Sequence, residues 1–202
     1  MIINVGTISK KDLRVRTQWI NDRRVNKYLY LQIPVSLKDT TSWFSRASKS
    51  ANRFDLVFRT VDGEAIGMAG ITAIDKVFSN AEIYIFVDPE WHGQGLGKAI
   101  IAWLLDYSFY VLELNRIYLY TDPENLVGVR LYERLGFLLE GRLREHRMKD
   151  GEVKDKLVYG MLSSEWAGTP HAIAERFTIV ASGKEDYKAP PRGLKMVVQH
   201  QK

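Results

Sequence analysis

Three glycines at alternate positions stand where a strand-like segment meets an apolar helical segment. They lie in the run His92-Gly93-Gln94-Gly95-Leu96-Gly97-Lys98, after the β-prone residues 81–87 and before an apolar stretch that predicts a helix over about 98–112. Glycines leave backbone N–H groups uncovered, and a helix N-terminus attracts anions. The run therefore predicts a phosphate or pyrophosphate site, to which Lys98 adds a charge. A tight turn without a ligand is the alternative.

Two common phosphate-binding loops do not fit this run. A Walker loop needs Ser or Thr directly after its lysine, whereas Ala99 follows Lys98. The dinucleotide-binding fingerprint needs its third glycine three positions after the second, on the first strand of a parallel sheet. Here Gly95 and Gly97 are two positions apart and follow segments that predict an antiparallel meander.

The rest of the chain predicts two helices, then the meander, then alternating strands and helices. Strands are expected over 2–8, 54–59, 64–71, 81–87, 116–121 and 154–162, and residues 137–140 are expected to start another. Besides the helix after the glycine run, helices are expected over 13–20, from Ser36 and over 125–135, with residues 21–35 irregular. This order predicts an α/β (α+β) three-layer sandwich whose mixed, mostly antiparallel central sheet is flanked by helices.

Composition narrows the class of protein. The 202 residues include no Cys, which excludes disulfide scaffolds, thiolate zinc sites and Cys nucleophiles. No apolar run approaches the roughly 20 residues that span a bilayer, and no secretory signal opens the chain, so we expect a cytoplasmic protein without a membrane partner. Of the net charge of +5, residues 167–202 carry +3 (six Lys and Arg, three Asp and Glu), which leaves the body near neutral and argues against a nucleic-acid partner.

A second motif adds to the glycine run. It reads Asn125-x-x-Gly128-x-x-Leu131-Tyr132-Glu133-Arg134-x-Gly136-Phe137. Together the two segments resemble the GNAT superfamily of acyl-CoA-dependent N-acetyltransferases, with His92 in place of the family's Arg or Gln and Gly128 in place of its alanine. Segments 19–22 and 140–146 resemble the branch that holds ribosomal-protein N-terminal, spermidine and amino-sugar acetyltransferases. The resemblance covers roughly residues 1–166 as one domain of the GNAT fold and leaves 167–202 as an appendage of unknown role.

The resemblance implies acetyl-CoA as co-substrate and no metal. Backbone N–H groups of residues 93–98 would bind its pyrophosphate, and a backbone N–H of the preceding strand would stabilise the oxyanion. Asn125 would hydrogen-bond the cofactor or N-cap its helix, and Arg130 and Arg134 would reach phosphates or only form a solvated face. The expected cofactor-binding residues are Ile85, Phe86, Val87, His92, Gly93, Gln94, Gly95, Leu96, Gly97, Lys98, Asn125, Arg130 and Arg134.

Two residues are candidates for proton transfer. The phenol of Tyr132 would protonate the departing thiolate; the alternative is a core aromatic. Glu82 would act as a base through water, or pair across the sheet, or bind a cationic acceptor. The acceptor amine could also arrive deprotonated. The acceptor pocket is expected around Trp19, Asn21, Asp22, Tyr28 and Trp43, with Asn21 or Asp22 holding the amine, whereas His146 is expected on the surface.

These observations predict transfer of an acetyl group to a primary amine by direct attack on the thioester. The acceptor would be a small molecule or a peptide: a protein N-terminus, a polyamine, an amino sugar or an amino acid. A homodimer is common in the branch that the chain resembles. A catalytically silent acyl-CoA-binding or sensory module is the alternative, and a nucleic-acid-associated protein that uses the basic tail is a third.

Overall fold

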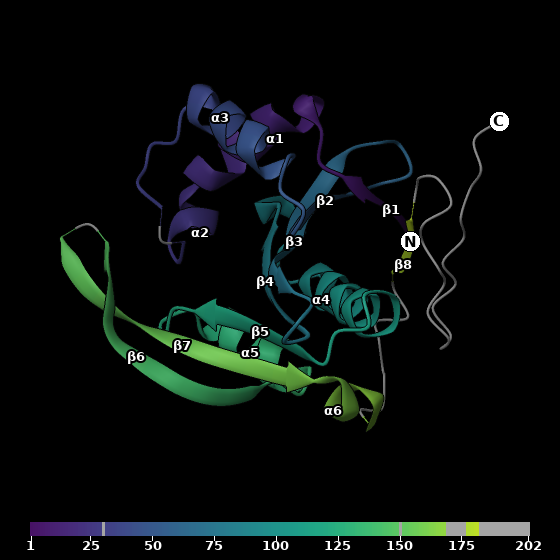
Figure 1. Ribbon diagram of the computed structural model, residues 1–202. Coiled ribbons are helices and arrows are strands. Elements are labelled where there is room, and N and C mark those ends of the chain that lie inside the picture. Colours follow the sequence, from purple (N-terminus) through teal and green to yellow (C-terminus); the bar gives the residue numbers. More distant parts are fainter. Residues whose placement is uncertain (30, 150, 169–176, 182–202) are drawn as a thin grey trace.

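The computed structural model describes residues 1–29, 31–149, 151–168 and 177–181, which form one sheet flanked by helices (Figure 1). The strand order is β6-β7-β5-β4-β3-β2-β1-β8. Neighbours are antiparallel except for the parallel pairs β4–β5 and β1–β8. The strands are β1 (Ile2–Thr7), β2 (Phe54–Arg59), β3 (Ala65–Asp75), β4 (Asn80–Val87), β5 (Arg116–Thr121), β6 (Leu138–Lys149), β7 (Glu152–Leu162) and β8 (Thr178–Ala181). The predicted mixed, mostly antiparallel sheet is confirmed.

Helices cover both faces of the sheet, which confirms the three layers. On one face lie α1 (Leu13–Asn21), α2 (Arg23–Asn26) and α3 (Leu37–Ala47); α4 (Leu96–Asp106) and α5 (Leu126–Arg134) lie on the other. Trp19 and Val25 pack against Val57, Met68 and Phe86 on the first face. Helix α6 (Ser163–Gly168) follows β7. Ser36 begins α3 with the capping box to Asp39 that the sequence predicts.

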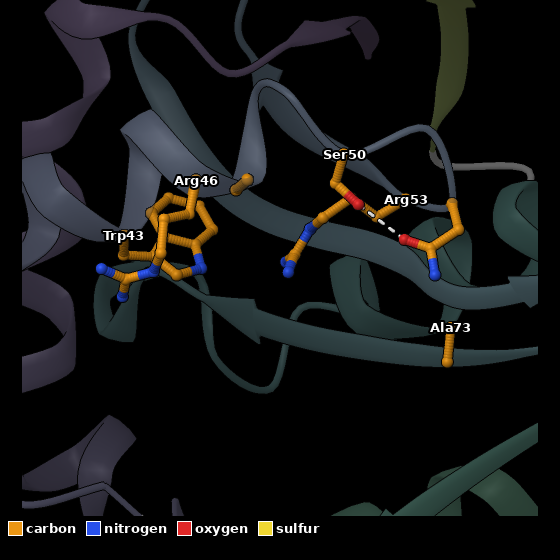
Figure 2. Close-up of a pocket in the computed structure, with 7 residues that line it drawn as sticks. Trp43, Arg46, Ser50, Arg53 and Ala73 are labelled. Atoms are coloured by element: carbon orange, nitrogen blue, oxygen red, sulfur yellow. Dashed lines mark hydrogen bonds between the residues drawn. The ribbon is translucent and has the colours of Figure 1, made fainter.

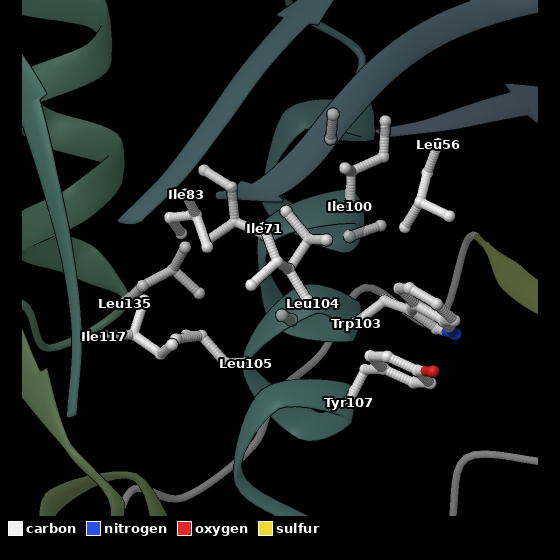
Figure 3. Close-up of a cluster of buried hydrophobic side chains, with 14 of the residues drawn as sticks. Leu56, Ile71, Ile83, Ile100, Trp103, Leu104, Leu105, Tyr107, Ile117 and Leu135 are labelled. Atoms are coloured by element: carbon white, nitrogen blue, oxygen red, sulfur yellow. The ribbon is translucent and has the colours of Figure 1, made fainter. Parts of the chain in front are cut away.

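The main core lies between the sheet and α4 (Figure 3). All described α4 residues from Ala99 to Asp106 are buried, as expected for a helix that is apolar all round. Trp103 stacks on Tyr107 with ring centroids 5.2 Å apart, and Ile100 is completely buried. This packing fixes α4, and with it the glycine run at its N-terminus.

Some boundaries differ from the predictions. Helix α2 falls in the segment expected to be irregular, and α4 begins at Leu96 because Gly95 is its N-cap. After Asp106 the chain continues as a π-helical turn, Tyr107–Val111. Strand β6 begins at Leu138, within the segment expected to start a strand, and runs on to Lys149. Most of its residues are exposed, so no alternation marks it in the sequence, and its pairing with β7 defines it.

Part of the expected appendage joins the sheet. Strand β8 pairs in parallel with β1, and Ile179 and Ala181 are buried in the main core. Phe177, just before β8, is buried there too. The boundary expected after residue 166 falls inside α6. The apolar segment at 196–198 lies outside the described residues, and the division into domain and appendage stays a prediction.

Candidate active site

The two central strands β4 and β5 separate partway along their length. They pair only at Asn80–Arg116, Ala81–Ile117 and Glu82–Tyr118, although β4 stays paired with β3 as far as Val87. The N–H of Asp88 donates to the Ile66 carbonyl of β3 at 3.0 Å. Because backbone groups alternate in direction along a strand, those of Ile83, Ile85 and Val87 face the gap towards β5. The gap therefore offers an open strand edge to an extended ligand.

A cleft of about 1030 Å³ opens at this gap. It is lined by residues of α1, α2, β4, α4, β5, α5, β6 and β7 and of the loops between them, including every cofactor-binding residue expected from the sequence except Gln94. The ring of Phe86 lines the cleft, while its backbone faces β3. A smaller cavity of about 240 Å³, lined by Trp43, Arg46 and Arg53 among others, shares Arg53 with the cleft (Figure 2).

The glycine run forms the turn into α4 at one end of the cleft. Gly93 and Gly95 have φ of +73° and +85°, a region that strains other residues, and the N-cap residue Gly95 has no side chain with which to cap the helix. A Cβ at Gly97 would lie 3.4 Å from Leu131 Cδ2, so α5 packs closely here. The first N–H groups of a helix lack intrahelical partners, and they suit an anion at this uncapped end.

The side chains of the run hold its shape. His92 Nε2 donates to the Val87 carbonyl at 3.0 Å, and Gln94 Nε2 donates to the Glu90 carbonyl at 3.0 Å. Lys98 lines the cleft and supplies a positive charge. The loop therefore offers a ligand mainly its backbone, which is why His92 can stand where the family has Arg or Gln.

Asn125 begins α5 and also lines the cleft, so both of its expected roles are compatible. Its Oδ1 accepts from the Gly128 N–H at 3.1 Å, and its Nδ2 donates to Thr121 Oγ1 at 3.2 Å. A Cβ at Gly128 would lie 2.5 Å from Asn125 Nδ2, so the Asn125 side chain packs directly against this glycine. Arg130 and Arg134 are exposed at the cleft and form no ion pair within the described part of the chain.

Tyr132 points a polar group at the cleft from a buried position. Its side chain packs beside Phe137 and Tyr159, with ring centroids 6.0 and 6.1 Å away, and the residue is only 8% exposed. Its hydroxyl makes no hydrogen bond to any described residue. Burial raises the pKa of Tyr132 to about 12, so the phenol is protonated at neutral pH and free to donate.

Glu82 lies on β4 where β5 diverges. Burial raises its pKa, while Lys156 and Arg147 oppose that shift. Tyr84 follows on the same face, and its hydroxyl donates to Asp55 Oδ1 at 2.6 Å. Arg53 donates to both oxygens of Asp55 at 2.7 Å. Glu82 is thus the carboxylate that lines the cleft itself, a position suited to accepting a proton.

The structure corrects the expected acceptor residues. Asn21 forms two hydrogen bonds with the backbone of Val35, at 2.7 and 2.8 Å, and Asp22 caps α2 and pairs with Arg24 at 2.8 Å. Neither lines the cleft, because both side chains hold the α1–α3 segment together.

The other residues expected in the acceptor pocket lie in three different parts of the structure. Trp19 is a core residue, Trp43 lines the smaller cavity, and Tyr28 lines the cleft. His146 is exposed, as expected. The cleft also contains cations that the sequence analysis missed: Arg16, Arg53, Arg147 and Lys156. They come from α1, from the position just before β2, from β6 and from β7, so no local motif marks them.

Lys149 ties the far end of β6 to the segment after α2. Its ammonium donates to the carbonyls of Lys27 and Leu29, each at 2.8 Å, and to that of Asn26. Leu29 lines the cleft, so this contact positions part of its wall.

Among the described residues no three His, Cys, Asp or Glu side chains gather into a metal site. The helices there are too short or too polar to cross a bilayer.

Comparison with known proteins gives a consistent result. The acetyltransferase (GNAT) domain family matches residues 5–138. The spermidine N(1)-acetyltransferase of Escherichia coli (strain K12) is 27% identical over 157 residues, 77% of this chain and 83% of that protein. An uncharacterized N-acetyltransferase of Bacillus licheniformis is 29% identical over 163 residues, covering 78% and 91%. The crystal structure of the spermidine N-acetyltransferase of Vibrio cholerae with CoA and spermine superposes with a TM-score of 0.77 at 27% identity, covering 82% and 98%.

Proposed function

Since this chain belongs to the GNAT acetyltransferase family and is an acetyl-CoA-dependent N-acetyltransferase, we propose that a primary amine attacks the thioester directly in the cleft between β4 and β5. The observation that carries this proposal is the gap in the sheet. An open strand edge at Ile83, Ile85 and Val87 leads directly to the uncapped N-terminus of α4. The two features match an extended arm that ends in a diphosphate.

The chain's residues fit acetyl-CoA, which when bound supplies the acetyl group as an activated thioester. The N–H groups of residues 93–98 would hold the diphosphate, with Lys98 beside them. The N–H groups of Ile85 and Val87 face the gap and are the candidates to stabilise negative charge on the carbonyl oxygen. Asn125, Arg130 and Arg134 would complete the phosphate side of the cleft.

Starting from an ammonium, two protons must leave the nitrogen and one must reach the sulfur. An alkylammonium of pKa about 10.4 has to lose a proton before attack, and Glu82 would accept it through water. A phenol with a pKa of about 10 is a weaker acid than a thiol of about 8.5, so full transfer from Tyr132 to a free thiolate is uphill. Tyr132 therefore donates a hydrogen bond while charge develops on sulfur. The first proton from the nitrogen leaves through Glu82 to solvent before attack, and the second, lost after attack, balances the one that sulfur gains.

The test is acetyl-CoA binding combined with turnover. Titration calorimetry should show binding at micromolar concentration, and ligand at 100 times Kd should stabilise the fold by about 2.7 kcal/mol. Thiol release should then follow with at least one primary amine from a panel of peptides, polyamines, amino sugars and amino acids. Binding without turnover of any amine would instead support the silent module. The homodimer and the cytoplasmic location stay predictions, the first of which light scattering tests.

A further inference from the structure

Arg16 is a buried cation that forms no hydrogen bond with the described residues. The residue is 9% exposed and lines the cleft from α1. Its guanidinium carbon lies 3.6 Å from the centroid of the Trp43 ring and 5.9 Å from that of Phe86. Its Nε is buried and makes no hydrogen bond within the described residues. Arginine stays charged in proteins, and burying a charge without an anion is costly, so this position favours a ligand that brings one.

The neighbouring carboxylate does not satisfy Arg16. Asp55 acts on Arg16 electrostatically, but its oxygens already accept two hydrogen bonds from Arg53 at 2.7 Å and one from Tyr84 at 2.6 Å. Burial lowers the pKa of Arg16, and the positive charge of Arg53 adds to that effect. The group formed by Arg16, Arg53 and Asp55 therefore keeps an excess of one positive charge.

A second cationic pair faces the same side of β4. Lys156 is 9% exposed, and its ammonium lies 4.0 Å from the Tyr120 ring centroid. Burial lowers the pKa of Lys156, and the positive charge of Arg147 lowers it further. The positive charges of Lys156 and Arg147 both stabilise the ionised form of Glu82. Tyr84, the next residue on this face of β4, is about 7 Å from Glu82 along the strand. Among the described residues on this face of β4, four cations thus lie with two carboxylates, Asp55 and Glu82.

We propose that the acceptor amine also carries an anionic group, a phosphate or a carboxylate, which the buried guanidinium of Arg16 binds. This inference rests on the proposed function and narrows its substrate class. A planar guanidinium offers paired donors that match either anion, and the Trp43 ring packs against that of Arg16. A polyamine would bring several positive charges to a wall that already has an excess of them. The acceptor then differs in charge from spermine, which the Vibrio cholerae enzyme binds.

The experiment compares acceptors that differ only in the anion. The pairs are glucosamine 6-phosphate with glucosamine and α-amino acids with their amides, and spermidine is the polycation. At low ionic strength, the anionic member of at least one pair should have a kcat/KM tenfold or more above its neutral partner, with spermidine the poorest acceptor. The pair whose anionic member has the higher kcat/KM identifies the anion as phosphate or carboxylate. A preference for spermidine, or equal values in both pairs, would overturn the proposal while leaving the acetyltransferase intact.

Variants assign the preference to Arg16. Arg16→Gln should raise KM for the anionic acceptor tenfold or more, with KM for acetyl-CoA and for the neutral partner within about twofold, and Arg16→Lys should restore part of the loss. Arg14→Gln, on the exposed side of the same helix, is the matched control. If Arg16→Gln slowed both partners equally, Arg16 would not bind the anion.

Binding gives a readout that does not need turnover. Calorimetry of the same pairs on CoA-saturated protein should favour the anionic member, and equal affinities would reject the proposal even if Arg16→Gln did not fold. Failure of acetyl-CoA itself to bind would contradict the proposed function instead.

Discussion

Removing the Tyr132 hydroxyl should slow turnover without weakening the fold. The hydroxyl makes no hydrogen bond to a described residue, so Tyr132→Phe removes no internal bond, and the melting temperature should stay within about 3 °C. Burial raises the pKa of Tyr132 from 10.0 to about 12, which makes ionisation about 3 kcal/mol harder than in water and keeps the donor in place. A hydrogen bond to a charged group contributes about 1.5–3 kcal/mol, which corresponds to a loss of about ten- to hundredfold in kcat.

The assay is release of the CoA thiol followed with a chromogenic reagent, and the chain contributes no background because it has no cysteine. KM for acetyl-CoA should change less than about threefold. Tyr110→Phe is the control, because the Tyr110 hydroxyl is also buried without a partner but lies outside the cleft. If Tyr132→Phe kept full kcat, or if Tyr110→Phe lost as much, Tyr132 would not act on the leaving sulfur.

Three further substitutions test the loop, the base and the cleft wall. Gly95 has φ +85°, and a Cβ there would have only Phe177 within 4.0 Å, so Gly95→Ala should lower the free energy of unfolding by about 1–2 kcal/mol and raise KM for acetyl-CoA. Gly63→Ala, at φ +87° in the β2–β3 turn, is the control and should lower the free energy of unfolding as much without raising that KM. Equal KM values for the two variants would contradict the loop's role. Because the pKa of Glu82 is raised, kcat/KM should fall on the acid side of the pH profile at a pH above the ordinary pKa of glutamate. Glu82→Gln should be slow and should not show this fall. If the variant still showed it, Glu82 would be excluded as the base. Lys149→Met removes the hydrogen bonds to the carbonyls of Lys27 and Leu29, so it should raise KM for the acceptor and leave KM for acetyl-CoA unchanged, as measured by initial rates. An unaltered KM for the acceptor would show that these hydrogen bonds do not shape the wall of the cleft.

The sequence predicts the half of the site that is local. The glycine run and the motif from Asn125 to Phe137 each sit within one turn or one helix, so their spacing alone indicates their structure. Strands of the meander alternate clearly, and Ser36 with Asp39 marks a helix start that the structure confirms. Short-range chemistry determines these elements, and a linear reading therefore finds them.

The acceptor side is different, because long-range packing assembles it. Arg16 is brought to the cleft by α1 and Lys156 by β7, at a sequence separation that no motif spans. Asn21 and Asp22 stand in a motif-like segment, but their hydrogen bonds serve the local fold. The same limit applies to β6, which forms because β7 lies beside it rather than through a pattern of its own.

The parting of β4 and β5 also has a mechanical consequence. Only three residue pairs join one side of the sheet, which contains β8, β1, β2, β3 and β4, to the other, which contains β5, β7 and β6. A continuous sheet resists bending about an axis along its strands, whereas this one has a hinge line through its middle. An extended ligand hydrogen-bonded to the exposed edge of β4 would stiffen the sheet at this hinge line. The enzyme with acetyl-CoA bound should therefore be stiffer than the free enzyme, and its amides at Ile85 and Val87 should exchange more slowly with solvent deuterium.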